Sequence, residues 1–189
     1  MLKTIILLTG QVEQPVLGAI LREQNPHLSI HPVATAGELG RFAPKLLRRA
    51  RLVAFCTDVL VPADVLAALG YGAYNFHPGP PHFPGWGAAH FAILQKATEF
   101  GTTAHIMVEK VDAGPIVAAD LFPVPPGATV TGLEELAYVR LAQMFRRLSF
   151  ALTQAEALQA LPIRWSGQKC TRARYAALAA AARAMGEVA

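Results

Sequence analysis

The sequence predicts an α/β protein built on a mostly parallel sheet, with an antiparallel hairpin in its C-terminal half. In the first half of the chain, short and unbroken apolar runs alternate with segments of helical spacing. This alternation is typical of βαβ units, which place their strands in parallel. In the second half, two β-rich runs are separated only by residues 111–115, and a connection this short indicates a hairpin.

The first half of the chain is expected to contain four buried strands and three helices. The strands are predicted at residues 3–9, 29–34, 52–56 and 71–76, and the helices at residues 12–24, 36–49 and 62–69. The strand predictions depend on apolar runs without alternation, because a strand in a parallel sheet is covered on both faces. Proline helps to place the helices, since Pro26 follows the first one and Pro62 begins the third.

The second half is expected to contain a helix, the hairpin and then two more helices. These are predicted at residues 86–97, at 102–110 and 116–122 for the hairpin strands, at 131–152, and in an alanine-rich tail after residue 163. We see no linker long enough to divide the chain. The sequence therefore predicts a single domain over residues 1–189, with a helical tail from about residue 160.

The composition favours a folded, cytoplasmic protein. Apolar residues make up 53% of the 189 positions and charged residues 16%, which argues against disorder. No apolar run reaches the roughly 18 residues of a membrane-spanning helix, and the apolar start is interpreted as a strand rather than a signal peptide. Cys56 and Cys170 are too few for a disulfide framework and are expected to be reduced. The net charge of +4 is mild and identifies no partner.

Three polar residues are predicted to meet at the ends of neighbouring strands. Asn75 and His77 are two residues apart on one strand, so their side chains point to the same side, and a stiff proline-rich loop follows them. Asp112 lies in the hairpin connection, beside that strand. A carboxylate can orient a histidine, and an amide can donate to a developing oxyanion, so this set suits acyl transfer. No Ser, Thr or Cys is placed as a nucleophile, which favours direct attack by a substrate.

Other interpretations of these residues stay open. An Asn-x-His sequence at a strand end is more often structural than catalytic, and Asp-Ala-Gly-Pro is an ordinary turn sequence. The histidines at positions 77, 82, 90 and 105 could instead bind a metal, although their spacing is not specific. Gly10 begins no nucleotide-phosphate motif, and the basic residues of the tail lack interleaved aromatic side chains. We therefore expect no metal, no nucleic acid and no membrane partner.

Two motifs together resemble those of the formyltransferases that use 10-formyltetrahydrofolate. The first is Asn75-Phe76-His77-Pro78, and the second is Val111-Asp112-Ala113-Gly114-Pro115. Residues 101–105 are also similar to the strand that precedes the aspartate turn in these enzymes. The resemblance extends over roughly residues 50–125. It implies a Rossmann-like, three-layer α/β/α formyltransferase fold, in a member whose first half is shortened.

The resemblance also implies a role for each matched residue. His77, as an imidazolium, would stabilise the oxyanion and protonate the leaving nitrogen of the folate, while Asn75 would donate to the same oxygen. Asp112 would hold His77 and help to remove the proton of the attacking amine. The formyl donor would be held by residues at two segments, namely Phe55, Cys56, Thr57, Asp58, Val59 and Leu60, and Glu109 and Val111.

Departures from the family pattern bear on the acceptor. Gly79-Pro80-Pro81-His82 replaces the Ser-Leu-Leu-Pro that usually follows the histidine, and His82 and His90 are expected to line the acceptor pocket. The glycine-rich loop that holds the phosphate of glycinamide ribonucleotide has no counterpart at Gly10, and we expect no C-terminal barrel like that of methionyl-tRNA formyltransferases.

The sequence therefore favours formyl transfer to a primary amine of a small molecule in one-carbon metabolism, with an amino sugar preferred over tRNA and glycinamide ribonucleotide. Two alternatives remain. One is a 10-formyltetrahydrofolate hydrolase, and the other is a non-catalytic folate-binding or regulatory subunit. The oligomeric state does not follow from the sequence, and a homodimer is one option.

Overall fold

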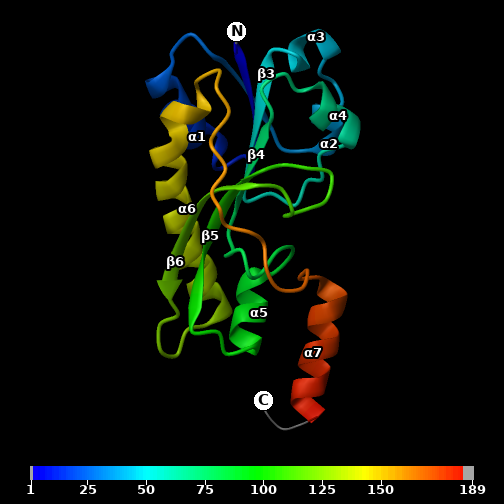
Figure 1. Cartoon of the computed structure of the whole chain (residues 1–189), viewed down its shortest axis with the longest axis vertical. Helices are drawn as coiled ribbons and strands as arrows, with labels where there is room; N and C mark the ends of the chain where they lie inside the picture. The colour runs from blue at the N-terminus through cyan, green and yellow to red at the C-terminus, as the bar shows by residue number, and fades with distance from the viewer. Residues whose placement is uncertain (1, 185–189) are drawn as a thin grey trace.

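The computed structural model describes residues 2–184 and shows a six-stranded mixed sheet between layers of helices (Figure 1). The strand order is β2-β1-β3-β4-β5-β6, with β1 to β4 parallel and both β5 and β6 antiparallel to their neighbours. The strands are β1 (Thr4–Leu8), β2 (Ser29–Val33), β3 (Ala50–Phe55), β4 (Ala73–His77), β5 (Glu99–Ile106) and β6 (Ile116–Pro123). The predicted parallel sheet with an antiparallel hairpin in the C-terminal half is confirmed.

Helices cover both faces of the sheet. They are α1 (Gln14–Gln24), α2 (Ala36–Leu39), α3 (Pro44–Leu47), α4 (Ala63–Ala68), α5 (Ala88–Leu94), α6 (Val130–Leu152) and α7 (Arg172–Ala184). Helices α1 and α6 pack on one face, and α2, α3 and α4 pack on the other (Figure 1). No helix within residues 2–184 is both long and apolar enough to cross a membrane.

The central strands are buried on both faces, as the unbroken apolar runs predict. In β1, Ile5 and Leu7 face the cluster under α1 and α6, whereas Ile6 and Leu8 face the cluster under α2, α3 and α4. This division follows from the two-residue period of a strand. Because neither face of β1 meets water, the alternation of apolar and polar residues seen in half-exposed strands is absent here.

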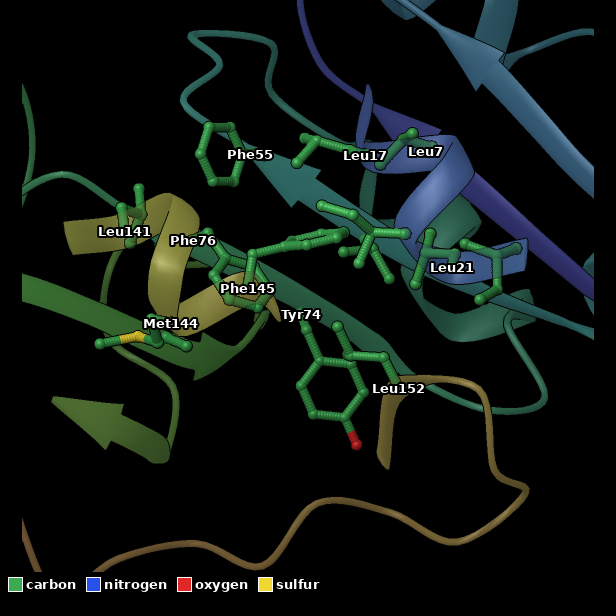
Figure 2. Packing of buried hydrophobic residues seen from close by; sticks show 14 of the residues in the cluster. Leu7, Leu17, Leu21, Phe55, Tyr74, Phe76, Leu141, Met144, Phe145 and Leu152 are labelled. Carbon is green, nitrogen blue, oxygen red and sulfur yellow. The ribbon is translucent and has the colours of Figure 1, made fainter. Parts of the chain in front are cut away.

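An aromatic group joins the strands to the long helix α6. Phe145 of α6 packs against Phe76 of β4 and Phe55 of β3, with ring centroids 5.1 and 5.9 Å apart. Figure 2 shows this group beside Leu141 and Met144 of the same helix. The backbone of β4 is therefore held firmly just before its carboxyl end, where Asn75 and His77 lie.

The helix predicted at residues 36–49 is interrupted and forms α2 and α3 instead. Ala43 has an extended conformation, with φ −65° and ψ 144°, because the ring of Pro44 disfavours a helical conformation in the residue before it. Pro44 then begins α3, a position in which proline is well tolerated. The same rule predicts the end of α1 at Asn25-Pro26, and it applies here with equal force.

The hairpin also differs from its prediction. The first of its strands, β5, begins at Glu99 and ends at Ile106, so the strand ends earlier than predicted and the connection to β6 is longer. A register irregularity between Ala104 and His105 accompanies this change. The loop that carries Asp112 is consequently longer than the five residues that the sequence predicts.

A fully buried arginine connects β3 to the end of α6. Arg51 donates hydrogen bonds to the carbonyls of Tyr71, Ala151, Leu152, Gln154 and Glu156, at 2.7–3.2 Å. Its guanidinium also lies over the ring of Tyr74 on β4, 5.2 Å from the centroid. Several of these carbonyls belong to the last turn of α6 and the residues just after it, where the helix itself supplies no donors. Arg51 therefore acts as a cap supplied by a strand.

Candidate active site

The site forms where β4 ends and the parallel half of the sheet meets the antiparallel half. Strand β4 pairs in parallel with β3 and antiparallel with β5. Within that antiparallel register, Asn75 is opposite His105 and His77 is opposite Thr103. Side chains of residues directly opposite each other lie on the same face of the sheet. His105 and Thr103 therefore join Asn75 and His77 as polar side chains on this face.

Asp112 lies at the centre of this group. Its Oδ1 accepts hydrogen bonds from His105 Nε2 at 3.1 Å and from Asn75 Nδ2 at 3.4 Å. Its Oδ2 accepts a bond from the backbone N–H of Gly85 at 2.8 Å and lies 3.4 Å from His77 Nδ1. The structure thus brings Asp112 together with Asn75 and His77, which lie 37 and 35 residues before it in the sequence.

The pKa values of the buried pair both move downwards. Burial lowers the pKa of His77 below its ordinary value of 6.5, although the charge of Asp112 and the carbonyl of Phe83 oppose the change. For Asp112, burial acts to raise the pKa, but the charge of His77 and the hydrogen bond from His105 outweigh it. The carboxyl group is held well below its usual range and is ionised at neutral pH.

Both ring nitrogens of His77 face oxygen atoms. Nδ1 is directed to Asp112, and Nε2 lies 3.1 Å from the backbone oxygen of Phe83. Gly79 is packed closely against this ring, because a Cβ atom at position 79 would meet both His77 Nε2 and the side chain of Ala88. The proline-rich loop that follows His77 in the chain therefore also holds its ring in position.

His105 is a member of the site that the sequence interpretation did not assign. The sequence marks it only as one of four candidate metal ligands and as part of a similar strand. The strand alternation that includes Thr103 and His105, combined with antiparallel pairing to β4, is the signal that would have identified it. His105 Nδ1 lies 2.9 Å from the carbonyl of Ile106, so its ring is held at both nitrogens. No group of His, Cys, Asp or Glu in residues 2–184 is arranged to hold a metal ion.

The residues expected to hold the folate lie beside the site on two segments. Phe55 is buried in the core, Cys56 and Thr57 are half-buried, and Leu60 is 68% exposed. Cys56 has a positive φ of 44°, and its backbone N–H donates to Phe76 O at 3.2 Å. Asp58 is exposed. Burial raises the pKa of the Cys56 thiol to about 12, so this cysteine is not a thiolate nucleophile.

The second expected folate segment approaches the first. Glu109 is exposed and Val111 is half-buried, both in the loop between β5 and β6. Met107, at the start of this loop, packs against the same buried cluster as Val59 and Val61. The start of the loop therefore lies on the same face of the sheet as the first segment.

His82 and His90 are placed away from Asp112. His82 is exposed, lies 3.4 Å from the Ser166 hydroxyl and lines a cavity of about 490 Å³. His90 lies on α5, 3.6 Å from Glu134, and its ring contacts those of Trp86 and Tyr175. His82 thus borders a cavity, and it lies in the same proline-rich loop that contacts His77.

An aromatic side chain from the C-terminal part of the chain covers the group. The Trp165 ring centroid is 5.8 Å from that of His77 and 5.0 Å from that of His105. Its indole N–H donates to Gly114 O at 2.8 Å. The sequence interpretation did not assign Trp165, because a contact between residues so distant in the chain leaves no local pattern.

The arrangement combines an amide donor, a histidine of lowered pKa and an ionised carboxylate. An amide N–H and a protonated ring can both stabilise negative charge on an oxygen, and an ionised carboxylate can hold and receive a proton. These groups suit a reaction in which a carbonyl carbon becomes tetrahedral and a nitrogen leaves with a proton.

Comparison with known sequences gives a consistent result. The family model described as "Formyl transferase" matches residues 34–143. The methionyl-tRNA formyltransferase of Geobacillus sp. (strain WCH70) is 33% identical over 132 residues, which cover 65% of this chain and 41% of that relative. The chain thus spans less than half the length of this relative.

Solved structures share the fold at low sequence identity. A sugar N-formyltransferase from a Shewanella species superposes with a TM-score of 0.76 and 18% identity, covering 94% of this chain and 79% of the other. The formyltransferase PseJ from Anoxybacillus kamchatkensis, solved with UDP-4,6-dideoxy-4-formamido-L-AltNAc and tetrahydrofolate, superposes with a TM-score of 0.73 and 15% identity. That match covers 92% of this chain and 88% of PseJ.

Proposed function

Since the chain belongs to the formyl transferase family, we propose that it transfers the formyl group of 10-formyltetrahydrofolate to a primary amine of a small molecule. The observation that carries this proposal is the convergence of Asn75, His77 and Asp112 within hydrogen-bonding or ion-pair distance at one sheet edge. Membership of the family alone would not show that these three side chains lie close enough to act together.

The folate fits the site by its chemistry. It supplies an activated formyl group on a nitrogen that must take up a proton when it leaves. Phe55, Cys56, Thr57, Asp58, Val59 and Leu60, together with Glu109 and Val111, would hold it. The partly exposed amide of Asn75 would donate to the formyl oxygen, and protonated His77 would donate its proton to the departing nitrogen.

The lowered pKa of His77 suits this proton transfer. Burial makes the imidazolium a stronger acid than an exposed one, so its proton is released more readily to a nitrogen base. The ionised Asp112 keeps the ring oriented and would accept the proton of the attacking amine. His77 would thus release one proton and Asp112 would take up another, so the pair carries out both transfers.

An amino sugar is our preferred acceptor. Two fold relatives are described as a sugar N-formyltransferase and as an enzyme bound to a formamido sugar nucleotide. His82, beside the cavity of about 490 Å³, would contact this acceptor, and His90 would do so from α5. We further propose that the chain acts as one catalytic domain, and in the cytoplasm, because Cys56 and Cys170 are both free thiols.

The decisive experiment follows the release of tetrahydrofolate from 10-formyltetrahydrofolate, with and without a panel of amines that includes amino sugar nucleotides. Amine-dependent release is expected. Release without any amine would instead identify a hydrolase, and folate binding without release would identify a non-catalytic binding subunit.

His77→Ala tests the assignment within the same assay. We expect turnover to fall by about 10²–10⁴-fold, the usual contribution of general acid–base catalysis, while folate binding stays nearly intact. His27→Ala is the matched control, because His27 is exposed in the turn before β2. Retention of full activity by His77→Ala would show that the assigned role is wrong.

A further inference from the structure

The segment of residues 161–170, here called the strap, runs across the site between α6 and α7 (orange in Figure 1). Its backbone is bonded to the site loops at several points. Leu161 N–H donates to Ile116 O at 2.7 Å, Ser166 N–H to Pro81 O at 3.0 Å, and Cys170 N–H to Pro84 O at 2.7 Å. The strap is therefore attached both to the start of β6 and to the proline-rich loop.

The strap places the Trp165 indole against both histidines of the site. The ring is edge-on to His77 and His105, and its N–H is bonded to Gly114 O, two residues beyond Asp112. The residues on either side of it, Arg164 and Ser166, line the cavity of about 490 Å³. The ring of Trp165 faces the histidines, while its two sequence neighbours face the cavity.

The side chains beside this ring are almost completely shielded from solvent. The exposed fractions are 8% for the His77 side chain, 5% for Asp112 and 3% for His105. A polar group of this kind, at the surface end of a strand, would ordinarily be hydrated. An aromatic ring lies over it instead, and it offers no further donor or acceptor because its only N–H is already bonded.

We propose that Trp165 determines the choice of acceptor, by keeping water away from the formyl carbon while an amine is admitted. The inference rests on the proposed formyl transfer and deepens it. In the transfer, the amine nitrogen bonds to the formyl carbon and loses a proton to Asp112, the bond from that carbon to the folate nitrogen breaks, and that nitrogen gains a proton from His77. In the competing reaction, a water oxygen bonds to the same carbon, so formate and tetrahydrofolate are released. Excluding water from a site prevents side reactions of this kind.

Trp165→Ala tests the proposal through the ratio of amine-independent to amine-dependent tetrahydrofolate release. We expect this ratio to rise by about tenfold or more, because water then reaches the site. Trp165→Phe keeps a ring in place but loses the N–H to Gly114, so it should give a smaller rise. Phe150→Ala is the control, because it removes an exposed aromatic ring from α6 outside the site, and its ratio should not change.

A parallel fall of both activities in Trp165→Ala would overturn the proposal, since it would mark Trp165 as only structural. A wild-type chain that forms no product with any amine would refute the proposed function instead, and the inference with it.

Fluorescence tests the geometry independently of activity. Trp86 and Trp165 are the only tryptophans, so Trp86→Phe leaves Trp165 as the sole emitter. Acrylamide should quench it several-fold less than free indole, because the strap holds the ring against the site. Quenching equal to that of free indole would show that the Trp165 ring is not packed against the site in the way that the proposal requires.

Discussion

At the scale of single residues, the surroundings of His77 have opposite effects on its protonation. Its two ring nitrogens face Asp112 and the carbonyl of Phe83, and only the imidazolium can donate to both. Burial favours the neutral ring and lowers its pKa. A histidine held in this way gives up a proton readily, and the carboxylate of Asp112, 3.4 Å from Nδ1, keeps its ring oriented.

This balance predicts how stability depends on pH. An unfolded chain takes up a proton on His77 near the ordinary value of 6.5, whereas the folded chain takes it up only at lower pH. Between these values the unfolded state binds more protons, so the free energy of unfolding falls as pH falls. The slope for one proton is at most about 1.4 kcal/mol per pH unit.

Urea unfolding of the wild type and His77→Gln between pH 5 and 7 measures this effect. The variant should show a shallower slope than the wild type. The contribution of Asp112 is lost in the same direction but at lower pH, below its ordinary value of 3.8, so it does not interfere. Equal slopes in the two proteins would mean that burial does not lower the pKa of His77.

Residue-level prediction from the sequence succeeded where the geometry is local. Asn75 and His77 share a side because they are two apart on one strand, which needs no knowledge of the fold. His105 is different, because its place opposite Asn75 depends on how β5 pairs with β4. Trp165 depends on a contact across 60 or more residues, for which the sequence has no periodic signal.

At the scale of elements, Arg51 determines how the end of α6 meets the sheet. It is completely buried on β3, and its bonds to carbonyls at the end of α6 and beyond replace donors that the helix lacks. Burial lowers the pKa of this guanidinium, but an arginine stays charged at any pH of interest. A buried charge whose donors are paired is costly to disturb.

Arg51→Met should therefore destabilise the protein strongly. The thioether fills part of the space but leaves the carbonyls unpaired, so we expect a loss of about 3–5 kcal/mol in urea unfolding. Arg49→Met is the matched control, because Arg49 is exposed two residues earlier, and it should change stability by less than about 0.5 kcal/mol. A loss in Arg51→Met no larger than that of the control would show that the cap is unimportant.

The bounds of the helices show why local sequence patterns predict the elements only in part. The apolar spacing of residues 36–49 resembles one helix, but Pro44 divides it, and Thr35 begins the first part with a capping box that includes Glu38. The burial of Arg51 could not be predicted in this way. A strand sequence that contains an arginine suggests an exposed position, and only the approach of α6 provides the carbonyls that make burial favourable.

At the scale of the whole molecule, the site is assembled from three parts of the chain that are far apart in the sequence. The parallel half supplies Asn75 and His77, the hairpin supplies His105 and Asp112, and the strap supplies Trp165. Gly85 connects these parts, because its N–H donates to Asp112 and its backbone pairs with Cys170 of the strap. The mixed sheet was predicted from the sequence, but this closure by the tail was not.

Gly85→Ala should release the strap while leaving the sheet intact. Gly85 has a φ of +99°, which disfavours alanine, and a Cβ atom there would meet the carbonyl of Cys170. A local cost of about 1–3 kcal/mol would make the amides of Ser166 and Cys170 exchange roughly 5- to 150-fold faster, as hydrogen-exchange measurements can show. Gly127→Ala is the control, because Gly127 also has a positive φ of 70° but has no atom within 4 Å of the added carbon. If both variants kept the same protection at Ser166 and Cys170, Gly85 would not be the connection between the strap and Asp112.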